Sequence, residues 1–298
     1  MTQESARTAI VVVALNYLVW GILPLFWALL DDVNALYVLA QRILWATVIA
    51  GAWVFLSATR RGGVRGGGLK AAFAGTSPAL VASAMAISVN WGLYIWAVSN
   101  GFVAYTALAY FVCPLLSVLL GAVVFAERLS PAQLIAILLA SFGAVVFGWG
   151  QAGMGLIIVF GVAGSFAIYA AIKRTVKVQT VTGLFVESAI LSPVAFLVIS
   201  TGMITPDVHV TPKTWVLFVL AGFVTFLPLV VMSHYARIVP FTLLGMLQYI
   251  APITQLLLGV TVFGEAISGR QIAALAVIIA GVGIFVASTN GRRRARHT

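Results

Sequence analysis

The chain has 298 residues, of which 62% are hydrophobic and only 8% are charged. Such an apolar composition excludes a soluble globular core and indicates a polytopic membrane protein. The formal net charge of +10 comes from Lys and Arg that flank apolar stretches, a placement typical of membrane topology rather than of nucleic-acid binding. The single cysteine, Cys113, lies inside an apolar stretch, so no internal disulfide is expected.

Ten apolar stretches have the length of about 20 residues that crosses the ~30 Å hydrocarbon core of a bilayer. In chain order they are 8–29, 35–57, 78–99, 104–125, 130–150, 153–172, 181–201, 213–235, 240–263 and 269–289. We expect each to be an α-helix, because a helix satisfies its own backbone polar groups in lipid. The first stretch lacks a small-residue cleavage site before Asp31, so we expect it to remain in the protein.

Lys and Arg concentrate in the connections on one side of these stretches. That side holds Arg7, Arg60, Arg61, Arg65, Lys70, Arg128, Lys173, Arg174, Lys177, Arg237, Arg292, Arg293, Arg294 and Arg296. The opposite side holds only Lys213 and Arg270, together with several acidic residues. Because cytoplasmic loops carry an excess of Lys and Arg, both termini are predicted to be cytoplasmic.

The second half of the chain repeats the pattern of the first when Pro114 is aligned with Pro252. Identical pairs in this alignment are Leu119/Leu257, Leu120/Leu258, Gly121/Gly259, Val124/Val262, Phe125/Phe263, Glu127/Glu265, Ser130/Ser268, Gln133/Gln271, Gly143/Gly281 and Phe147/Phe285. We predict two repeats, 1–150 and 151–298, with five spans each and a basic cytoplasmic tail on the second. An odd number of spans orients the copies oppositely, so the predicted fold is all-α, with ten transmembrane helices as two inverted five-helix repeats.

The connections contain no recognisable enzymatic or nucleotide-binding motif. The Gly- and Arg-rich connection 58–77 lacks the Gly-Lys-Ser/Thr ending and preceding strand of a phosphate-binding loop, so we interpret it as a flexible cationic linker. None of the three histidines has an acidic neighbour at helical spacing. Because no metal-ligand or nucleophile–base pattern is present, we expect neither catalysis nor a metal, a cofactor or a bound nucleotide.

Three prolines inside predicted spans indicate irregular backbone. Pro114 and Pro252 lie at equivalent positions of the two repeats, and Pro228 lies in the eighth span. A proline removes the amide that would bond the carbonyl four residues earlier, so we expect freed carbonyls at Tyr110 and Gln248. Such backbone is tolerated where it lines a wet cavity or is buried in protein. The alternative is a packing kink, but recurrence in both repeats favours a gating role.

Aromatic and amide side chains in the spans are the candidates for substrate contact. They are Trp20, Asn90, Tyr94, Tyr110, Tyr169, Gln248 and Tyr249. Asn90 and Tyr94 are four residues apart and therefore share a helix face. Buried Tyr, Trp and Gln need hydrogen-bond partners, and this set suits a pocket for a small zwitterion with an apolar side chain. Helix packing is the alternative for each ring.

Two charged residues, Arg42 and Glu187, lie inside predicted spans. Each is ~10 Å deep at ~1.5 Å per residue, but from opposite faces, so we expect no direct ion pair between them. Intramembrane charges usually face the protein interior and serve function, whereas snorkelling is the alternative for Arg42. The shorter Glu187 side chain is the candidate carboxylate for proton coupling.

Several stretches carry a family resemblance: Trp20-Gly21, 90–98, 114–128, 248–252 and 252–265. The repeat endings resemble the EamA-type repeats of the drug/metabolite transporter superfamily, and 90–98 and 248–252 are similar to its RarD-type members. The resemblance covers nearly the whole chain. It implies a multi-pass exporter of amino acids or related metabolites in a bacterial inner membrane, like the YddG-like exporters. It also implies that Glu127 and Glu265 are structural.

Three functions compete for this sequence. Export by alternating access between the repeats is favoured, and it requires a small-molecule substrate and a lipid bilayer, without nucleic acid or nucleotide. A passive solute channel would need paired half-spans entering from each face, and no such short apolar segments are visible. A membrane enzyme or lipid-handling protein is disfavoured by the missing catalytic cluster. The substrate and the oligomeric state are not predicted.

Overall fold

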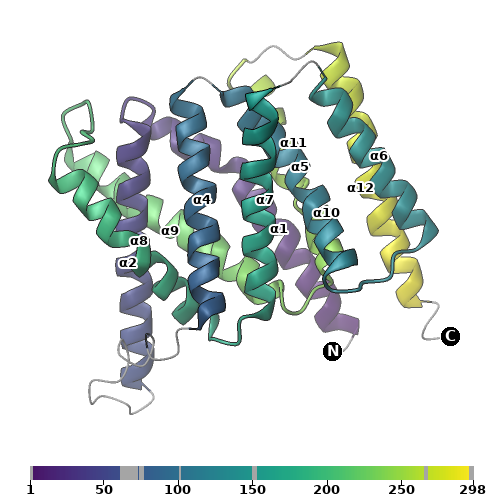
Figure 1. The fold of residues 1–298 in the computed structure, drawn as a ribbon, viewed down its shortest axis with the longest axis horizontal. Helices are drawn as coiled ribbons and strands as arrows, with labels where there is room; N and C mark the ends of the chain where they lie inside the picture. Colours follow the sequence, from purple (N-terminus) through teal and green to yellow (C-terminus); the bar gives the residue numbers. More distant parts are fainter. Residues whose placement is uncertain are drawn as a thin grey trace. The chain divides into compact units, whose positions relative to one another are not determined.

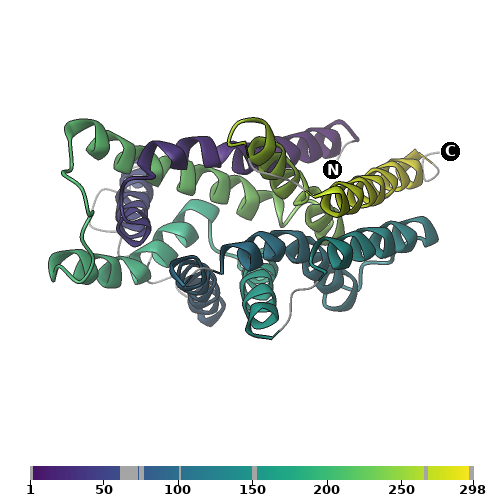
Figure 2. The same ribbon diagram turned by 90° about the horizontal axis from the view of Figure 1, so that it is seen from above.

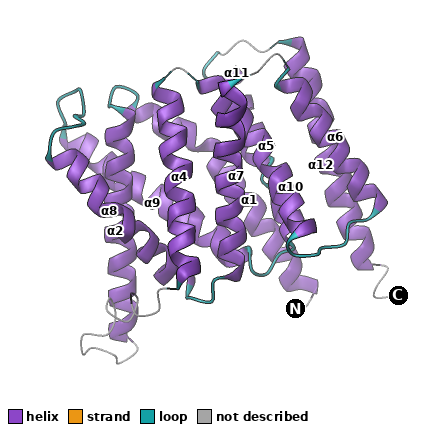
Figure 3. Cartoon of the chain, in the orientation of Figure 1, coloured by secondary structure: helices purple, strands orange, loops and turns teal. Residues whose placement is uncertain are grey.

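The computed structural model describes residues 3–60, 73, 77–100, 102–149, 153–264 and 268–294. Within these residues the regular structure is helical and contains no strand (Figure 3). The helices are α1 (Gln3–Trp27), the 3-10 helix η1 (Ala28–Leu30), α2 (Ala35–Arg60), α4 (Pro78–Ser99), α5 (Val103–Val123), α6 (Pro131–Phe147), α7 (Met154–Thr175), α8 (Thr180–Ser200), α9 (Pro212–Tyr235), α10 (Phe241–Leu247), α11 (Ile250–Thr261) and α12 (Gly269–Arg294).

Each of the ten predicted spans coincides with helix. Among the described residues, eight helical segments are long and apolar enough to cross a membrane, and α6 is a shorter apolar helix. The 22-residue α4 covers the third predicted span. The ninth span, Phe241–Thr261, is formed by α10 and α11 in succession. The all-helical prediction is therefore confirmed, while the inverted orientation of the repeats stays a prediction.

The chain forms two compact units. Unit 1 comprises Met1–Ile22, Val89–Ala171 and Tyr235–Thr298, and unit 2 comprises Leu23–Ser88 and Ile172–His234. Each unit thus draws on both halves of the sequence. The predicted repeats 1–150 and 151–298 divide the sequence rather than these units, and they stay a prediction. Glu265, the end of the basic tail and most of the predicted linker 58–77 lie outside the described residues.

In unit 1, α6 and α12 run side by side (Figures 1 and 2). A Cβ atom on Gly143 would lie 2.6 Å from Cγ1 of Ile278 and 2.8 Å from the carbonyl oxygen of Ala274. A Cβ atom on Gly281 would lie 2.7 Å from the carbonyl oxygen of Ala136. These contacts are reciprocal under the repeat alignment. Close approach of the two helices therefore explains why both positions are glycine.

The same two helices begin with the same capping box. Ser130 accepts from the Gln133 amide at 3.2 Å, and the Gln133 side chain accepts from the Ser130 amide at 2.9 Å. Ser268 and Gln271 repeat both bonds at the start of α12, at 3.3 and 3.0 Å. Each box satisfies two backbone donors that a helix start leaves without partners. Two of the identical residue pairs in the repeat thus encode helix starts.

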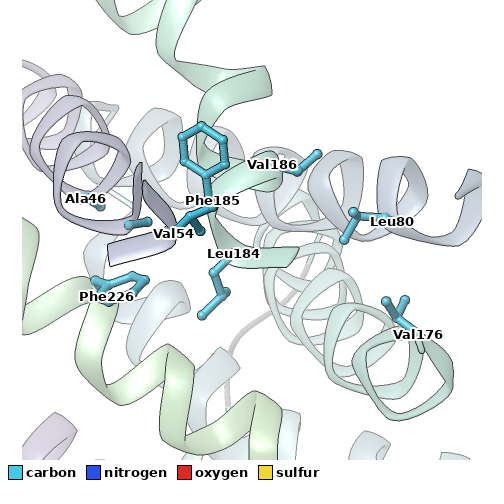
Figure 4. Packing of buried hydrophobic residues seen from close by; sticks show 9 residues of the cluster. Ala46, Val54, Leu80, Val176, Leu184, Phe185, Val186 and Phe226 are labelled. Carbon is cyan, nitrogen blue, oxygen red and sulfur yellow. The ribbon is translucent and has the colours of Figure 1, made fainter. Parts of the chain in front are cut away.

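Unit 2 has its own apolar core. Its buried members are Ala46, Ala50 and Val54 of α2, Leu80 of α4, Val176 after α7, Leu184, Phe185 and Val186 of α8, and Phe226 of α9 (Figure 4). α2 and α8 pack along each other, and a Cβ on Gly51 would lie 3.0 Å from the Phe185 ring. The large ring thus occupies the space that this small residue leaves on the facing helix.

A polar contact in unit 2 joins the start of α2 to the connection between α8 and α9. The Asn34 side-chain amide donates to Asp207 Oδ2 at 2.9 Å, and the Thr205 hydroxyl donates to Asp207 Oδ1 at 2.8 Å. The Asn34 backbone amide also donates to the Pro206 carbonyl at 3.2 Å. These side-chain hydrogen bonds, first that from Asn34 and then that from Thr205, hold the pKa of Asp207 below its ordinary value.

Candidate functional site

The candidate site lies in unit 1 and is built around the side chain of Gln248. We call it the Gln248 cluster, and its members are Tyr17, Cys113, Ser117, Gln248 and Tyr249, all of which are buried. The Gln248 Oε1 atom accepts from the Ser117 hydroxyl at 3.1 Å and from the Cys113 thiol at 3.6 Å. Two residues four apart on α5 therefore fix one end of the amide.

A break in the ninth span places Gln248. α10 ends at Leu247 and α11 begins at Ile250, so Gln248 and Tyr249 lie between the two helices. The backbone amide of Gln248 donates to two backbone carbonyls, those of Leu244, at 3.2 Å, and Gly245, at 3.1 Å. This tightened turn ends α10 directly beside α5. Gln248 and Tyr249 keep helical backbone angles at this break, and both side chains are buried in unit 1.

Glycine and a glutamate hold α10 against α5. A Cβ on Gly245 would lie 3.0 Å from the Pro114 carbonyl oxygen, so a larger residue would push the helices apart. At the start of α10, the Glu127 carboxylate accepts from the backbone amides of Phe241, at 2.7 Å, and Thr242, at 2.9 Å. It also accepts from the Thr242 hydroxyl at 2.8 Å. Glu127 thus has the structural role that the family resemblance implies, and it positions the helix leading to Gln248.

Three polar atoms of the Gln248 cluster are buried without a hydrogen bond of acceptable geometry in the described structure. They are Gln248 Nε2, Tyr17 Oη and Tyr249 Oη. The Tyr17 hydroxyl nevertheless lies close enough to the Gln248 side chain to interact with it. An unmade hydrogen bond costs about 1–3 kcal/mol for each buried group. Three such atoms in one cluster make it the candidate site for a ligand with matching hydrogen-bonding groups.

A row of aromatic rings leads away from the cluster along α1 and α7. The ring centroids are 5.5 Å apart for Tyr17 and Trp20, 6.0 Å for Trp20 and Phe166, and 6.0 Å for Phe166 and Tyr169. The Trp20 carbonyl, whose helix donor is missing because residue 24 is proline, accepts from the Gln255 side-chain amide at 3.3 Å. This row connects two predicted contact residues, Trp20 and Tyr169, with the cluster that contains Gln248 and Tyr249.

The other three predicted contact residues occupy different surroundings in unit 1. Asn90 donates to the Val162 carbonyl at 2.7 Å and to the Ser165 hydroxyl at 3.2 Å, which ties α4 to α7. Tyr94 and Tyr110 pair with each other, with centroids 6.1 Å apart. Tyr110 is 39% exposed, whereas Gln248 is 5% exposed. Asn90 thus has partners in the protein, and the equivalent repeat positions Tyr110 and Gln248 differ in burial.

Pro252 behaves differently from the prediction of a freed carbonyl. Pro114 and Pro228 lie inside the continuous helices α5 and α9, whereas Pro252 lies in the first turn of α11, where its missing amide breaks no helix bond. The Gln248 carbonyl accepts from the Ala251 amide at 3.1 Å. The prediction that Pro252 leaves this carbonyl without a donor is therefore wrong. The Gln248 atom without a hydrogen bond of acceptable geometry is Nε2 of its side chain.

Unit 2 contains the predicted carboxylate Glu187 in a buried ion pair. Glu187 Oε1 lies 2.9 Å from Lys173 Nζ, and the two side chains are 4% and 0% exposed. The Ser83 hydroxyl donates to the same oxygen atom. The sequence placed Lys173 in a cytoplasmic connection as a topology marker, but it belongs to the last turn of α7. The helix therefore extends to Thr175, past the predicted span end at residue 172, and the side of the membrane that Lys173 faces stays a prediction.

Arg42, the other intramembrane charge, lies on α2 in unit 2. Its guanidinium carbon is 5.8 Å from the centroid of the Trp27 ring, close enough for a cation–π interaction. The ion-pair partner that the structure gives to Glu187 is Lys173. The expectation that Arg42 and Glu187 do not pair directly agrees with this assignment. Within the described residues, no group of three or more His, Cys, Asp and Glu could hold a metal ion.

Sequence reasoning missed four residues that the structure brings into these clusters: Tyr17, Cys113, Ser117 and Lys173. Cys113 and Ser117 share a helix face with each other beside Pro114, a spacing that the sequence shows. Tyr17 precedes Trp20 by three residues and lies on the same face. Lys173 comes 14 residues before Glu187, with a short connection between the two helices. Antiparallel helices would bring such positions together, so this spacing was a usable signal.

Known proteins similar to the chain are bacterial transporters. No protein-family model matches the chain. The uncharacterized transporter YojE of Bacillus subtilis is 32% identical, over 99% of this chain and 99% of its own. Protein RarD of Streptomyces exfoliatus is 36% identical, over 94% of this chain and 89% of its own. Protein RarD of Escherichia coli is 31% identical, over 96% of both chains.

A solved protein structure also resembles the chain along its whole length. The superposition has a TM-score of 0.71 at 23% sequence identity, and it covers 98% of this chain and 99% of the other. At this identity the likeness concerns the fold alone. The helical architecture of the described residues therefore has a counterpart in an experimental structure.

Proposed function

The chain belongs to the RarD family of drug/metabolite transporters, and we propose that it exports amino acids or related small metabolites across a bacterial inner membrane. Relatives named as transporters and many apolar helices identify a multi-pass membrane transporter with a small-molecule substrate. The observation that carries the proposal is the Gln248 cluster, where three buried polar atoms without partners lie beside an aromatic row. A zwitterion with an apolar side chain matches both features.

The proposed substrate contacts all belong to unit 1. They are Trp20, Asn90, Tyr94, Tyr110, Tyr169, Gln248 and Tyr249. We assign the polar part of the substrate to Gln248 and Tyr249, whose side chains offer open hydrogen-bond valences. The apolar part rests on Trp20 and Tyr169, which the aromatic row joins. A carbonyl oxygen has two lone pairs. The backbone carbonyl of Gln248 already accepts one hydrogen bond, so it can accept a second one from an ammonium group.

We propose alternating access as the transport mechanism. Secondary transporters often place substrate at interrupted helices near the membrane midplane, and the ninth span has a short break in its regular hydrogen bonding between α10 and α11, at two residues that keep helical backbone angles. Pro252 follows this break, and Pro114 lies where α10 packs on α5. Together with Pro228 in α9, these residues are the proposed kink and gating positions. Pro114→Ala and Pro252→Ala should slow turnover at normal expression, and unchanged turnover would remove their gating role.

We propose that both termini face the cytoplasm, because Lys and Arg concentrate in the connections on that side. Reporter fusions at residue 298 and beside His209 should then report opposite sides of the membrane. The same side for both would contradict the ten-span topology.

For energy coupling we propose facilitated transport. Glu187, the candidate coupling carboxylate, is bound by Lys173 and Ser83, so its charge has partners within unit 2. If transport were coupled to protons, Glu187 would be the carboxylate that carries them, with Arg42 as the second intramembrane charge. A proton gradient should therefore leave accumulation at equilibrium unchanged in wild-type proteoliposomes. Accumulation driven by an imposed pH difference, and lost in Glu187→Gln, would replace facilitated transport with coupling through this residue.

A panel of labelled amino acids in proteoliposomes tests the proposed function. Purified protein should exchange one or more apolar amino acids, and unlabelled substrate on the far side should accelerate uptake of the label. Such counterflow requires a carrier whose site alternates between the two sides. Flux without acceleration would support the passive channel, and no flux of any amino acid above empty liposomes would contradict amino-acid export. Gln248→Ala provides the matched variant, because it should lower flux without changing expression.

A further inference from the structure

We propose that the Gln248 cluster binds the carboxyl-derived oxygen of the substrate, through Gln248 Nε2 and the hydroxyls of Tyr17 and Tyr249. The inference rests on the proposed function and adds which substrate group this cluster recognises. Its basis is that these three polar atoms are buried in unit 1 with no hydrogen bond of acceptable geometry in the described structure.

The surroundings of Gln248 determine which end of its amide is open. The Ser117 hydroxyl and the Cys113 thiol both approach Oε1, at 3.1 and 3.6 Å. A thiol is only a weak hydrogen-bond donor, and its sulfur is a poor acceptor for an amide N–H. The Gln248 side-chain oxygen, and not the nitrogen, therefore faces α5. The Nε2 group, which can only donate, is therefore the end left for a ligand. A donor of this kind requires an oxygen acceptor on that ligand.

The two tyrosine hydroxyls complete a neutral set of donors. Tyr17 lies close enough to Gln248 to interact with it, Tyr249 follows Gln248 in the chain, and all three side chains are buried in unit 1. A phenol hydroxyl can donate to a carboxylate or to an amide carbonyl. The carboxylate gains stronger, charge-assisted bonds, whereas the neutral carbonyl is cheaper to remove from water. We therefore expect both groups to bind, and an analogue without either group to fail.

This role predicts an unusual combination of effects for the tyrosine variants. Tyr17→Phe and Tyr249→Phe each remove a buried hydroxyl without a hydrogen bond of acceptable geometry, so the ligand-free protein should be as stable as wild type or more stable. Each variant should nevertheless bind substrate more weakly. A tyrosine whose hydroxyl served only the fold would show the opposite pattern, with lower stability and unchanged affinity.

The experiment compares three probes with the same side chain: leucine, leucinamide and 3-methylbutylamine, which lacks the carboxyl-derived group. Binding to purified full-length protein is measured by calorimetry, and the thermal midpoint is measured with and without each probe. Wild type should bind leucine and leucinamide and should bind the amine at least about tenfold more weakly, because it cannot satisfy the donors. Leucine binding without leucinamide binding would restrict the site to carboxylates, and the reverse would restrict it to neutral carbonyls; either supports the oxygen assignment.

Tyr17→Phe and Tyr249→Phe should each weaken leucine binding about tenfold, and Gln248→Leu should weaken it further. The matched control is Tyr37→Phe in unit 2, a buried tyrosine packed on Phe218, which should leave affinity unchanged. Equal binding of the amine and leucine, or wild-type affinity in both tyrosine variants, would overturn the proposal. Failure of wild type to bind any probe would overturn it as well.

The outcomes separate this inference from the proposed function. Counterflow of leucine with unchanged affinity in both tyrosine variants would leave transport standing and remove the oxygen site. Binding with the expected probe pattern but no flux in proteoliposomes would leave the oxygen site standing and remove transport.

Discussion

Unit 1 and unit 2 each bury a polar cluster among apolar helices, but they treat its hydrogen bonds differently. In unit 2 the Glu187 carboxylate is bound by Lys173 and Ser83. In unit 1, hydrogen bonds within the Gln248 cluster fix the oxygen end of the Gln248 side-chain amide. Three polar atoms of the cluster have no hydrogen bond of acceptable geometry. The partners of Glu187 fit a structural role, whereas the open valences of the Gln248 cluster are the ones that we propose a ligand fills. The sequence showed both glutamate and glutamine as intramembrane polar residues, and only their surroundings separate the two roles.

The largest expected effect comes from breaking the ion pair of unit 2. Lys173→Met should lower the free energy of unfolding by about 3–5 kcal/mol, because it removes the cation paired with a buried carboxylate. The double variant Lys173→Met/Glu187→Leu should recover most of that loss, since it removes both charges. Thermal unfolding of the purified protein measures both. The exposed Lys177→Met is the matched control and should be near wild type, and a stable Lys173→Met protein would show that the pair is unimportant to the fold.

A smaller effect is expected at the start of α10 in unit 1. Glu127→Gln should lower the unfolding free energy by about 1.5–3 kcal/mol, because one amide oxygen replaces a carboxylate that accepts three hydrogen bonds. It should also slow transport, since α10 leads to Gln248. Thermal unfolding and proteoliposome flux together measure the two effects. Asp32→Asn, which removes an exposed negative charge, should change neither. Normal flux in Glu127→Gln would show that this cap does not position the site.

Variants in the packing of α6 against α12 should change the stability of unit 1 without changing its candidate site. Gly143→Ala should cost about 1–3 kcal/mol, because its Cβ would lie 2.6 Å from Ile278. Gly283→Ala on the same pair of helices meets no atom within 4 Å and should stabilise α12 by up to about 1 kcal/mol. Thermal midpoints measure the difference between the two variants. Substrate affinity should remain unchanged in both, and a loss of affinity in Gly143→Ala would extend the site to this interface.

The smallest effect is expected at the connection between α8 and α9 in unit 2. Bonds from Asn34 and Thr205 lower the pKa of Asp207, so the charged form is the one that stabilises this contact. That stabilisation is present above the pKa of an unfolded aspartate, about 3.9, and is lost as the pH falls through the lower folded value. Proteolysis of the connection should rise in this acid range, and the rise should be absent in Asp207→Asn. A wild-type response in that variant would assign the change to another group.

Much of the fold could be predicted from the sequence because span length and hydropathy are local properties. The ten predicted spans coincide with helices, and the identical pairs Ser130/Ser268 and Gln133/Gln271 form equivalent caps. Gln248 was also predicted as a contact residue, both for its side chain and for a freed backbone carbonyl. The structure corrects the carbonyl, and the contact stays a proposal.

The rest depends on contacts between distant segments. Pro114 and Pro252 are equivalent in the sequence repeat, yet Pro114 lies inside the continuous α5, whereas the regular helix is interrupted between α10 and α11 just before Pro252. The interruption occurs where Gly245 brings α10 onto the Pro114 carbonyl, a contact that periodicity does not encode. Lys173 was placed just beyond a span because hydropathy ends that span at residue 172, whereas the structure extends α7 to Thr175 and pairs the buried Lys173 with Glu187. Polar residues in spans therefore need their tertiary partners before a role can be assigned.

Counterflow of a labelled apolar amino acid, measured in parallel for two variants at equal expression, tests the central claim most directly. Tyr249→Phe should reduce the rate about tenfold, because it removes a substrate contact in unit 1. Lys173→Met/Glu187→Leu should retain the wild-type rate, because the ion pair of unit 2 serves the fold. Wild-type counterflow in Tyr249→Phe, combined with loss in the stably folded double variant, would contradict the account and move substrate recognition to unit 2.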